Sequence, residues 1–139
     1  MALVSVMSSD HLSVLYLVGL TYAGAALRYF VSECLNKKHP SFYVGTCVCN
    51  IGGSVVSAIA FVAQQVWKSE EPFSSFYTLL SAVISGFSAA FTTMSTYAKE
   101  TVHLQEKNYL WFIAYSWCSV LCSFVLCISI FSFSIYAWL

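Results

Sequence analysis

Four long apolar stretches separated by short polar segments constrain the fold of this 139-residue chain more than any other feature. A helix needs about 20 consecutive apolar residues to cross the hydrocarbon core of a bilayer. The stretches run over residues 12–31, 42–66, 73–97 and 109–139. Only 9% of the residues are charged and 59% are hydrophobic, whereas a soluble domain carries about 25% charged residues. We therefore predict an all-α membrane protein, a single domain of four transmembrane helices over residues 1–139.

The same composition excludes several classes of protein. The formal net charge is zero, so the basic excess that a nucleic-acid-binding protein needs is missing. The sequence shows no nucleophile–base pair, no phosphate-binding loop and no zinc-ligand spacing, and we therefore do not expect an enzyme. The first apolar stretch lacks a basic n-region and a following small-residue cleavage site, so we expect it to remain as a membrane span.

The six cysteines are expected to pack as small apolar side chains. Five of them lie inside the apolar stretches, and only Cys34 lies near a polar loop. Cysteine is among the most buried residue types and behaves as a small hydrophobe. Cys47 and Cys49 are two positions apart on a helix, so their side chains point apart and do not readily chelate a metal together. This favours packing over disulfide bonding or metal binding.

The positions of the basic residues predict the orientation of the chain. The segments after the first and third stretches contain four lysines, Lys37, Lys38, Lys99 and Lys107. The opposite side carries only Lys68. Because lysine and arginine are enriched in cytoplasmic loops, this bias predicts that both termini face outward.

Polar side chains in the second stretch lie on one helical face. Thr46, Asn50 and Ser54 recur every four residues, the spacing that places side chains above one another. Gly45 and Gly53 form a small-residue seam beside them, which allows close helix approach in lipid. Because polar groups inside a membrane are costly unless paired, this face is a candidate for function.

Hydroxyl residues recur along the third stretch at alternating spacings of three and four, at Thr78, Ser81, Ser85, Ser88, Thr92 and Ser95. A single such residue normally bonds the carbonyl four residues earlier, but six in register favour a polar conduit. In residues 91–97, four hydroxyl residues occur in five positions, which weakens a regular helix. Non-helical backbone at membrane depth is tolerated where it lines a cavity, and its carbonyls can hold a cation. We therefore predict a helix break and an ion site there.

Charged residues at the spans leave several interpretations open. Arg28 is the only charge well inside a span. It either extends its head to the interface or provides a cation near the mouth of a pathway. Glu100 lies at the end of the third stretch, where it could pair with groups at the interface. A small dual-topology, proton-coupled multidrug or cation exporter would need a membrane-embedded carboxylate. Glu33 is the only candidate near a span, which disfavours that function.

Three short motifs occur in order along the chain. Residues 24–29 read GAALRY, residues 45–54 read GTCVCNIGGS, and Gly86 is followed by TTMSTY at 92–97 and then by Glu100. Together they resemble the three motifs of the small fluoride channels, the Fluc or CrcB family. Their order, their spacing and the four-span size match over nearly the whole chain.

The resemblance implies a fluoride-selective channel that exports fluoride passively across the plasma membrane. It implies an antiparallel dimer with two narrow anion pores at the dimer interface. Asn50 takes the place of the pore asparagine, and Met94 and Tyr97 stand where the family has phenylalanines whose ring edges face fluoride. The family's structural sodium ion at the dimer interface is held by backbone carbonyls, at the positions of Ala89 and Thr92.

The remaining candidate residues complete this interpretation. Tyr115 and Ser119 have the spacing of a polar track in the last helix. Further candidates for the anion pore are Thr46, Ser54, Thr93 and Ser95, and Arg28, Glu100 and Gly53 are assigned to the vestibule or to structure. Fluoride holds its water tightly, so a pore must offer replacement donors, and amide and hydroxyl groups supply them.

Departures from the family pattern leave the assembly open. Met94 removes one aromatic edge and Tyr97 adds a hydroxyl group. Ala89 and Ala90 stand where paired glycines are usual. Family members with biased loop charges sometimes work as heterodimers of oppositely oriented chains, and the loop charges here are biased. Met94 and the alanines favour a non-conducting partner subunit, and the choice between a homodimer and a heterodimer stays open.

Overall fold

The computed structural model describes residues 9–38, 42–67 and 74–138 as an all-helical protein. The helices, in chain order, are α1 (Ser9–Asn36), α2 (Val44–Trp67), α3 (Ser74–Ala82), the π-helix η3 (Val83–Ser88), α4 (Ala89–Phe91), α5 (Met94–Lys107) and α6 (Tyr109–Trp138). Within the described residues, four helical spans are long and apolar enough to cross a membrane. The predicted all-α architecture with four spans is therefore confirmed.

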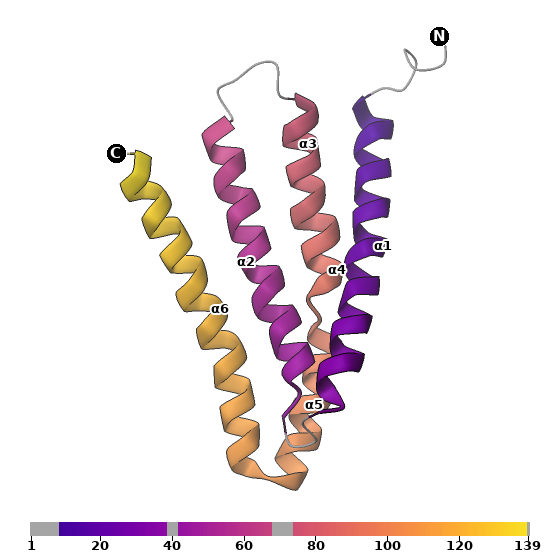
Figure 1. Cartoon of the computed structure of the whole chain (residues 1–139), viewed down its shortest axis with the longest axis vertical. Helices are drawn as coiled ribbons and strands as arrows, with labels where there is room; N and C mark the ends of the chain where they lie inside the picture. The colour runs from indigo at the N-terminus through magenta and orange to yellow at the C-terminus, as the bar shows by residue number, and fades with distance from the viewer. Residues whose placement is uncertain (1–8, 39–41, 68–73, 139) are drawn as a thin grey trace.

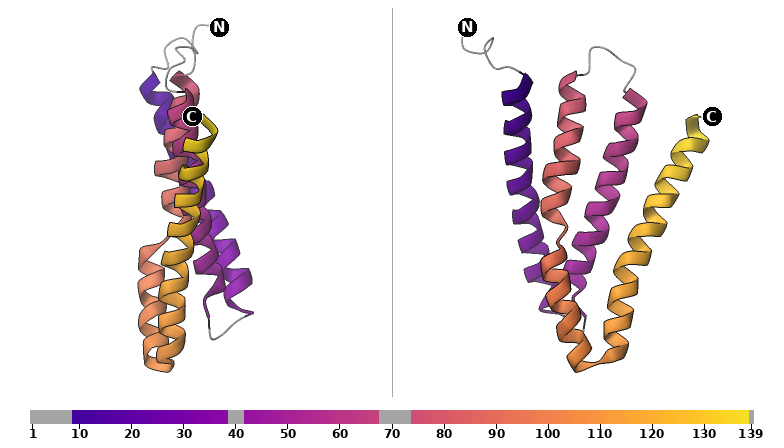
Figure 2. Two further views of the ribbon diagram at one scale, coloured as in Figure 1. Left: turned by 90° about the vertical axis from the view of Figure 1, so that its left-hand side faces the viewer. Right: turned by 180° about the vertical axis from the view of Figure 1, so that it is seen from behind.

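The four spans stand side by side and fan out from one end of the molecule (Figure 1). Across the fan the order is α6, α2, the third span and α1, and the side view shows that the layer is thin (Figure 2). The end of α6 and the start of α1 lie at the same end. Only 6% of the most apolar window of α1 and of α6 is buried inside the chain, against 33% for α2. Because α2 is the central element, its side chains meet those of the other three spans.

Glycines let the spans approach closely, since in lipid there is no hydrophobic driving force between helices. A Cβ atom on Gly24 of α1 would lie 2.3 Å from the carbonyl oxygen of Phe87 in η3. A Cβ atom on Gly53 of α2 would lie 2.4 Å from Cγ2 of Thr92. The predicted packing role of Gly53 therefore has a definite partner, the third span.

The third span is irregular at mid-depth. Its helix widens to a π-helix over η3, and after α4 the backbone of Thr92 (φ −77°, ψ 159°) and Thr93 (φ −153°, ψ 122°) is extended. Thr93 then caps α5, because its hydroxyl accepts a hydrogen bond from the Thr96 amide at 3.4 Å. The helix continues to Lys107, well beyond the apolar stretch that ends at residue 97.

A single residue connects α5 to α6. Asn108 donates its backbone N–H to the carbonyl of Leu104, and its Oδ1 accepts a hydrogen bond from the amide of Leu110 at 3.0 Å. The chain therefore reverses direction within one residue, capping one helix end and starting the next. This tight reversal places the first turns of α6 directly against α5 (Figure 1).

We expect Gly24→Ala to destabilise the protein, because its new methyl group would overlap the Phe87 carbonyl. Overpacking of this kind costs about 1–3 kcal/mol or more. Gly19→Ala is the matched control on the same helix, since a Cβ atom there meets nothing within 4 Å. The measurement is thermal unfolding in detergent together with size-exclusion profiles. Equal melting temperatures for the two variants would contradict the close contact.

Candidate functional site

A buried carboxylate joins four helices near the narrow end of the fan. Glu100 of α5 is 8% exposed. Its Oε1 accepts a hydrogen bond from Oγ1 of Thr46 at 2.8 Å and one from Nδ2 of Asn36 at 3.4 Å, and its Oε2 accepts one from the hydroxyl of Tyr115 at 2.6 Å. Thr46 lies in the first turn of α2, where the helix dipole favours negative charge. We call these four residues, Asn36, Thr46, Glu100 and Tyr115, the Glu100 cluster.

Backbone and aromatic groups pack around the Glu100 cluster. Oδ1 of Asn36 accepts a hydrogen bond from the amide of Gly45 at 2.7 Å, so the end of α1 caps the start of α2. Tyr115 is fully buried, stacks on Tyr97 at 5.2 Å between ring centroids and meets Phe42 edge-on at 5.3 Å. The cluster is therefore a satisfied polar core inside the membrane domain.

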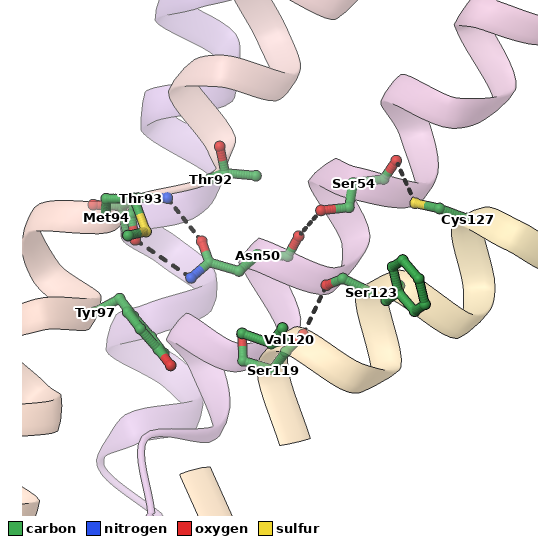
Figure 3. A pocket seen from close by; sticks show the side chains of 11 residues that line it. Asn50, Ser54, Thr92, Thr93, Met94, Tyr97, Ser119, Val120, Ser123 and Cys127 are labelled. Carbon is green, nitrogen blue, oxygen red and sulfur yellow. Dashed lines mark hydrogen bonds between the residues drawn. The ribbon is translucent and has the colours of Figure 1, made fainter. Parts of the chain in front are cut away.

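An open groove lies beside this core, between α2, the third span and α6. It has a volume of about 520 Å³. Its lining, most of which is labelled in Figure 3, consists of Asn50, Ser54, Thr92, Thr93, Met94, Tyr97, Ser119, Val120, Ser123, Phe124 and Cys127. We call it the Asn50 groove. Amide, hydroxyl and thiol groups supply its polar atoms, and none of the charged side chains in the described ranges lines it.

Asn50 fixes the extended segment of the third span. Its Oδ1 accepts a hydrogen bond from the backbone amide of Thr93 at 2.7 Å, and its Nδ2 donates to the Thr93 carbonyl at 3.3 Å (Figure 3). A side-chain amide thus replaces the helical hydrogen bonds that the extended backbone gives up. Because an amide nitrogen carries two hydrogens, Asn50 keeps a second N–H for the groove.

The candidate pore residues divide between the two places. Six of them line the Asn50 groove: Asn50, Ser54, Thr93, Met94, Tyr97 and Ser119. Thr46 and Tyr115 lie instead in the Glu100 cluster. Ser95 contacts the groove only indirectly, through a 3.5 Å hydrogen bond between its hydroxyl and that of Thr93.

The structure also changes the interpretation of individual side chains. Glu100 is buried within the third span. Glu33 is therefore not the sole candidate for a carboxylate embedded in the membrane. Glu33 is exposed and pairs with Lys37 one turn later, and the hydrogen bond that Lys37 donates to it raises the pKa of Lys37.

The Tyr97 ring is stacked on that of Tyr115, and the Tyr97 hydroxyl donates to the Ser116 carbonyl at 3.3 Å. Arg28 lies in α1 and does not line the groove.

The hydroxyl residues of the third span do not follow one common path. Ser81 accepts a 2.7 Å hydrogen bond from Gln64 of α2, so it ties two helices together. Ser85 donates to the carbonyl of Ser81. The buried Ser88 hydroxyl has no hydrogen-bond partner among the described residues. Of the six regularly spaced hydroxyl residues, Thr92 alone lines the Asn50 groove. Its neighbour Thr93, which is not one of the six, lines the groove as well.

Four lining residues were not among the predicted site residues: Val120, Ser123, Phe124 and Cys127. Ser123 and Cys127 extend the four-residue spacing that starts at Ser119, so that spacing could have identified them. Ser123 donates to the carbonyl of Ser119 at 2.8 Å, and Cys127 donates to the carbonyl of Ser54 at 3.7 Å. Val120 and Phe124 carry no polar signal that distinguishes them in an apolar span.

The backbone next to the groove suits a small hard cation better than a transition metal. No group of three or more His, Cys, Asp or Glu side chains that could hold a metal ion occurs among residues 9–38, 42–67 and 74–138. The Thr92 hydroxyl donates to the carbonyls of Ser88 at 3.0 Å and Ala89 at 3.4 Å. The extended backbone of Thr92 turns its own carbonyl out of the helical pattern. The available ligands are thus backbone oxygens.

Comparison with known proteins identifies the family. The model of the family described as CrcB-like protein, Camphor Resistance (CrcB), matches residues 15–131. The chain belongs to the CrcB family. A protein of Thermotoga maritima named fluoride-specific ion channel FluC is 35% identical over 105 residues, which cover 73% of this chain and 77% of that protein.

Two further relatives with the same name are similar over a shorter stretch. The protein of Pseudomonas syringae pv. maculicola is 41% identical over 91 residues, which cover 63% of this chain and 66% of that protein. That of Shewanella pealeana is 35% identical over 88 residues, with the same coverage. The chain thus spans about two thirds of the length of these curated relatives. Together with the four apolar spans, the family places this CrcB chain in the cell membrane as a multi-pass protein.

We expect Tyr115→Phe to destabilise the protein by about 1–3 kcal/mol, because it removes the buried donor to Oε2 of Glu100 and leaves that oxygen unsatisfied. Tyr109→Phe is the control, since Tyr109 is exposed at the start of α6. Thermal unfolding of the two variants in detergent tests this. A Tyr115→Phe protein as stable as Tyr109→Phe would show that the Glu100 cluster does not hold the helices together.

Proposed function

We propose that this chain is a subunit of a fluoride-selective channel that exports fluoride passively, with the anion path along the Asn50 groove. The single observation that carries the proposal is the groove itself, in which uncharged donors meet an extended backbone segment at mid-depth in a membrane domain. The family and the names of the relatives support fluoride as the ion.

The chemistry of the groove suits a small, strongly hydrated anion. The dehydration free energy of fluoride is large, and amide and hydroxyl hydrogens can replace the hydrogen bonds that the ion loses when it leaves water. The second N–H of Asn50 and the hydroxyl of Ser119 are the donors available in the groove, since the Ser123 hydroxyl already donates to the Ser119 carbonyl. Conduction requires binding weak enough for release. Uncharged donors meet that requirement better than a buried lysine or arginine would.

A second subunit would complete the path. Met94 is 76% exposed on the open side of the groove, and both outer spans bury little surface within one chain. We propose an antiparallel dimer, with the chain itself or with a homologous chain in the opposite orientation, and pores at the interface. The positive-inside bias favours outward termini and hence one fixed orientation for this chain, which favours a homologous chain over a second copy as the antiparallel partner.

A structural sodium ion at the dimer interface is part of the proposal. The carbonyls of Ala89 and Thr92 would hold it, since Thr92 is extended and the Thr93 amide, the helical partner of the Ala89 carbonyl, binds Asn50 instead. The Asn50 side chain keeps this segment in its extended form. Asn50 would therefore serve both the anion path and the cation site.

The proposal is tested by ion efflux from liposomes that contain the purified chain, alone and with a homologous chain. We expect rapid fluoride efflux while chloride is retained. Efflux only in the presence of the homologous chain would identify a heterodimer. No fluoride efflux in either preparation would overturn the channel function.

Asn50→Ala should reduce fluoride efflux at least tenfold, because it removes the groove's amide donor and the support of the extended segment. Ser129→Ala is the control, since Ser129 is exposed on α6 and bonds only its own helix at Val125. Fluoride-electrode recordings from liposomes with equal protein content provide the comparison. Unchanged flux in Asn50→Ala would remove this residue from the path.

Replacing sodium with a large organic cation during purification should lower the melting temperature of the dimer and its fluoride flux. The physical reason is that opposed backbone carbonyls repel one another without a cation between them. Thermal unfolding in the two buffers measures the effect, and lithium serves as the control for ion size. Equal stability and flux without sodium would exclude a structural sodium ion.

A further inference from the structure

Two thiols gather on consecutive turns of α6. The sulfur atoms of Cys118 and Cys122 lie 3.9 Å apart, and both residues are exposed. A third thiol, Cys47 of α2, is buried in the chain. Neither Cys118 nor Cys122 lines the Asn50 groove, although Ser119 between them does. The pair is therefore a separate feature from the proposed anion path.

The helix geometry disfavours a disulfide within this pair. Side chains four residues apart on a helix have Cβ atoms about 5–6 Å apart. A disulfide brings its Cβ atoms to about 3.5–4.5 Å and would have to distort α6. A disulfide within the pair is therefore disfavoured, whereas a single atom can bridge the two sulfurs without moving the backbone.

The separation of the sulfurs selects the kind of bridging atom. Bonds from a soft ion to thiolate sulfur are about 2.3 Å long, so a linear bridge would hold the sulfurs about 4.6 Å apart. At 3.9 Å the bridge is bent instead. Thiolates are soft ligands and bind preferentially to soft ions or atoms. Trivalent arsenic is thiophilic and forms bent, pyramidal bonds, whereas mercury(II) and copper(I) prefer a linear pair of thiolates.

We propose that Cys118 and Cys122 form a dithiol site for trivalent arsenicals that carry one organic group. An arsenoxide, R–As=O, reacts with both thiols to form two As–S bonds. The two thiol protons leave with the arsenic-bound oxygen as one water molecule, and no atom changes its oxidation state. Occupancy of this site does not depend on the proposed channel function.

Phenylarsine oxide is the probe for the wild-type protein in detergent. We expect one phenylarsenic group per chain by intact mass and the loss of two titratable thiols. A dithiol such as dithiothreitol should reverse the reaction, whereas an equal amount of a monothiol should not. Peptide mapping should show that the probe protects Cys118 and Cys122 from iodoacetamide. Protection of any other pair would overturn the proposal.

Single substitutions give the matched comparison. Cys118→Ser and Cys122→Ser should each abolish dithiol-specific uptake, because one sulfur cannot form the two As–S bonds. Cys34→Ser and Cys47→Ser should each retain one phenylarsenic group per chain. Loss of uptake in Cys47→Ser would overturn the assignment in favour of a site between α2 and α6. Retention in Cys118→Ser or Cys122→Ser would overturn it outright, and the wild-type mapping stands if a variant fails to fold.

Discussion

The Glu100 carboxylate and its donors are the interaction on which the rest of this membrane domain depends. Asn36 ends α1, Thr46 begins α2, and Tyr115 lies in the second turn of α6, so three helices meet the one that carries Glu100. A buried carboxylate with missing donors would be very costly in lipid. The complete set of donors therefore fixes where the four spans converge and from which end the fan opens.

The polar groups of the spans form two adjacent sites, the buried Glu100 cluster and the open Asn50 groove. The Glu100 cluster uses its donors internally, whereas in the Asn50 groove the second amide hydrogen of Asn50 is left without a partner in the described part of the chain. The ring of Tyr97 stands between them, because it stacks on Tyr115 and also lines the groove. The proposed anion path thus lies directly beside the polar core that holds the helices together.

Sequence patterns predicted the helical spans because about 20 apolar residues can satisfy their backbone in lipid only as a helix or as part of a closed barrel. They also named most groove residues of α2 and of the third span. They placed Glu100 at an interface, since a sequence shows no burial, and they grouped Thr46 and Tyr115 with the pore. Nothing in the sequence indicated that Asn50 would bind both backbone polar groups of Thr93.

The sequence by itself determined that the chain crosses the membrane four times and that its informative residues are the few polar ones inside the spans. These properties follow from local composition and helical spacing. The tertiary structure decided which of those polar residues form hydrogen bonds with one another and which line the open groove. That choice depends on contacts across 43 to 64 positions of sequence, such as Asn50 with Thr93 and Asn36 with Glu100. No local pattern encodes such contacts, because they exist only once glycine contacts and the one-residue α5–α6 connection have set the helices side by side.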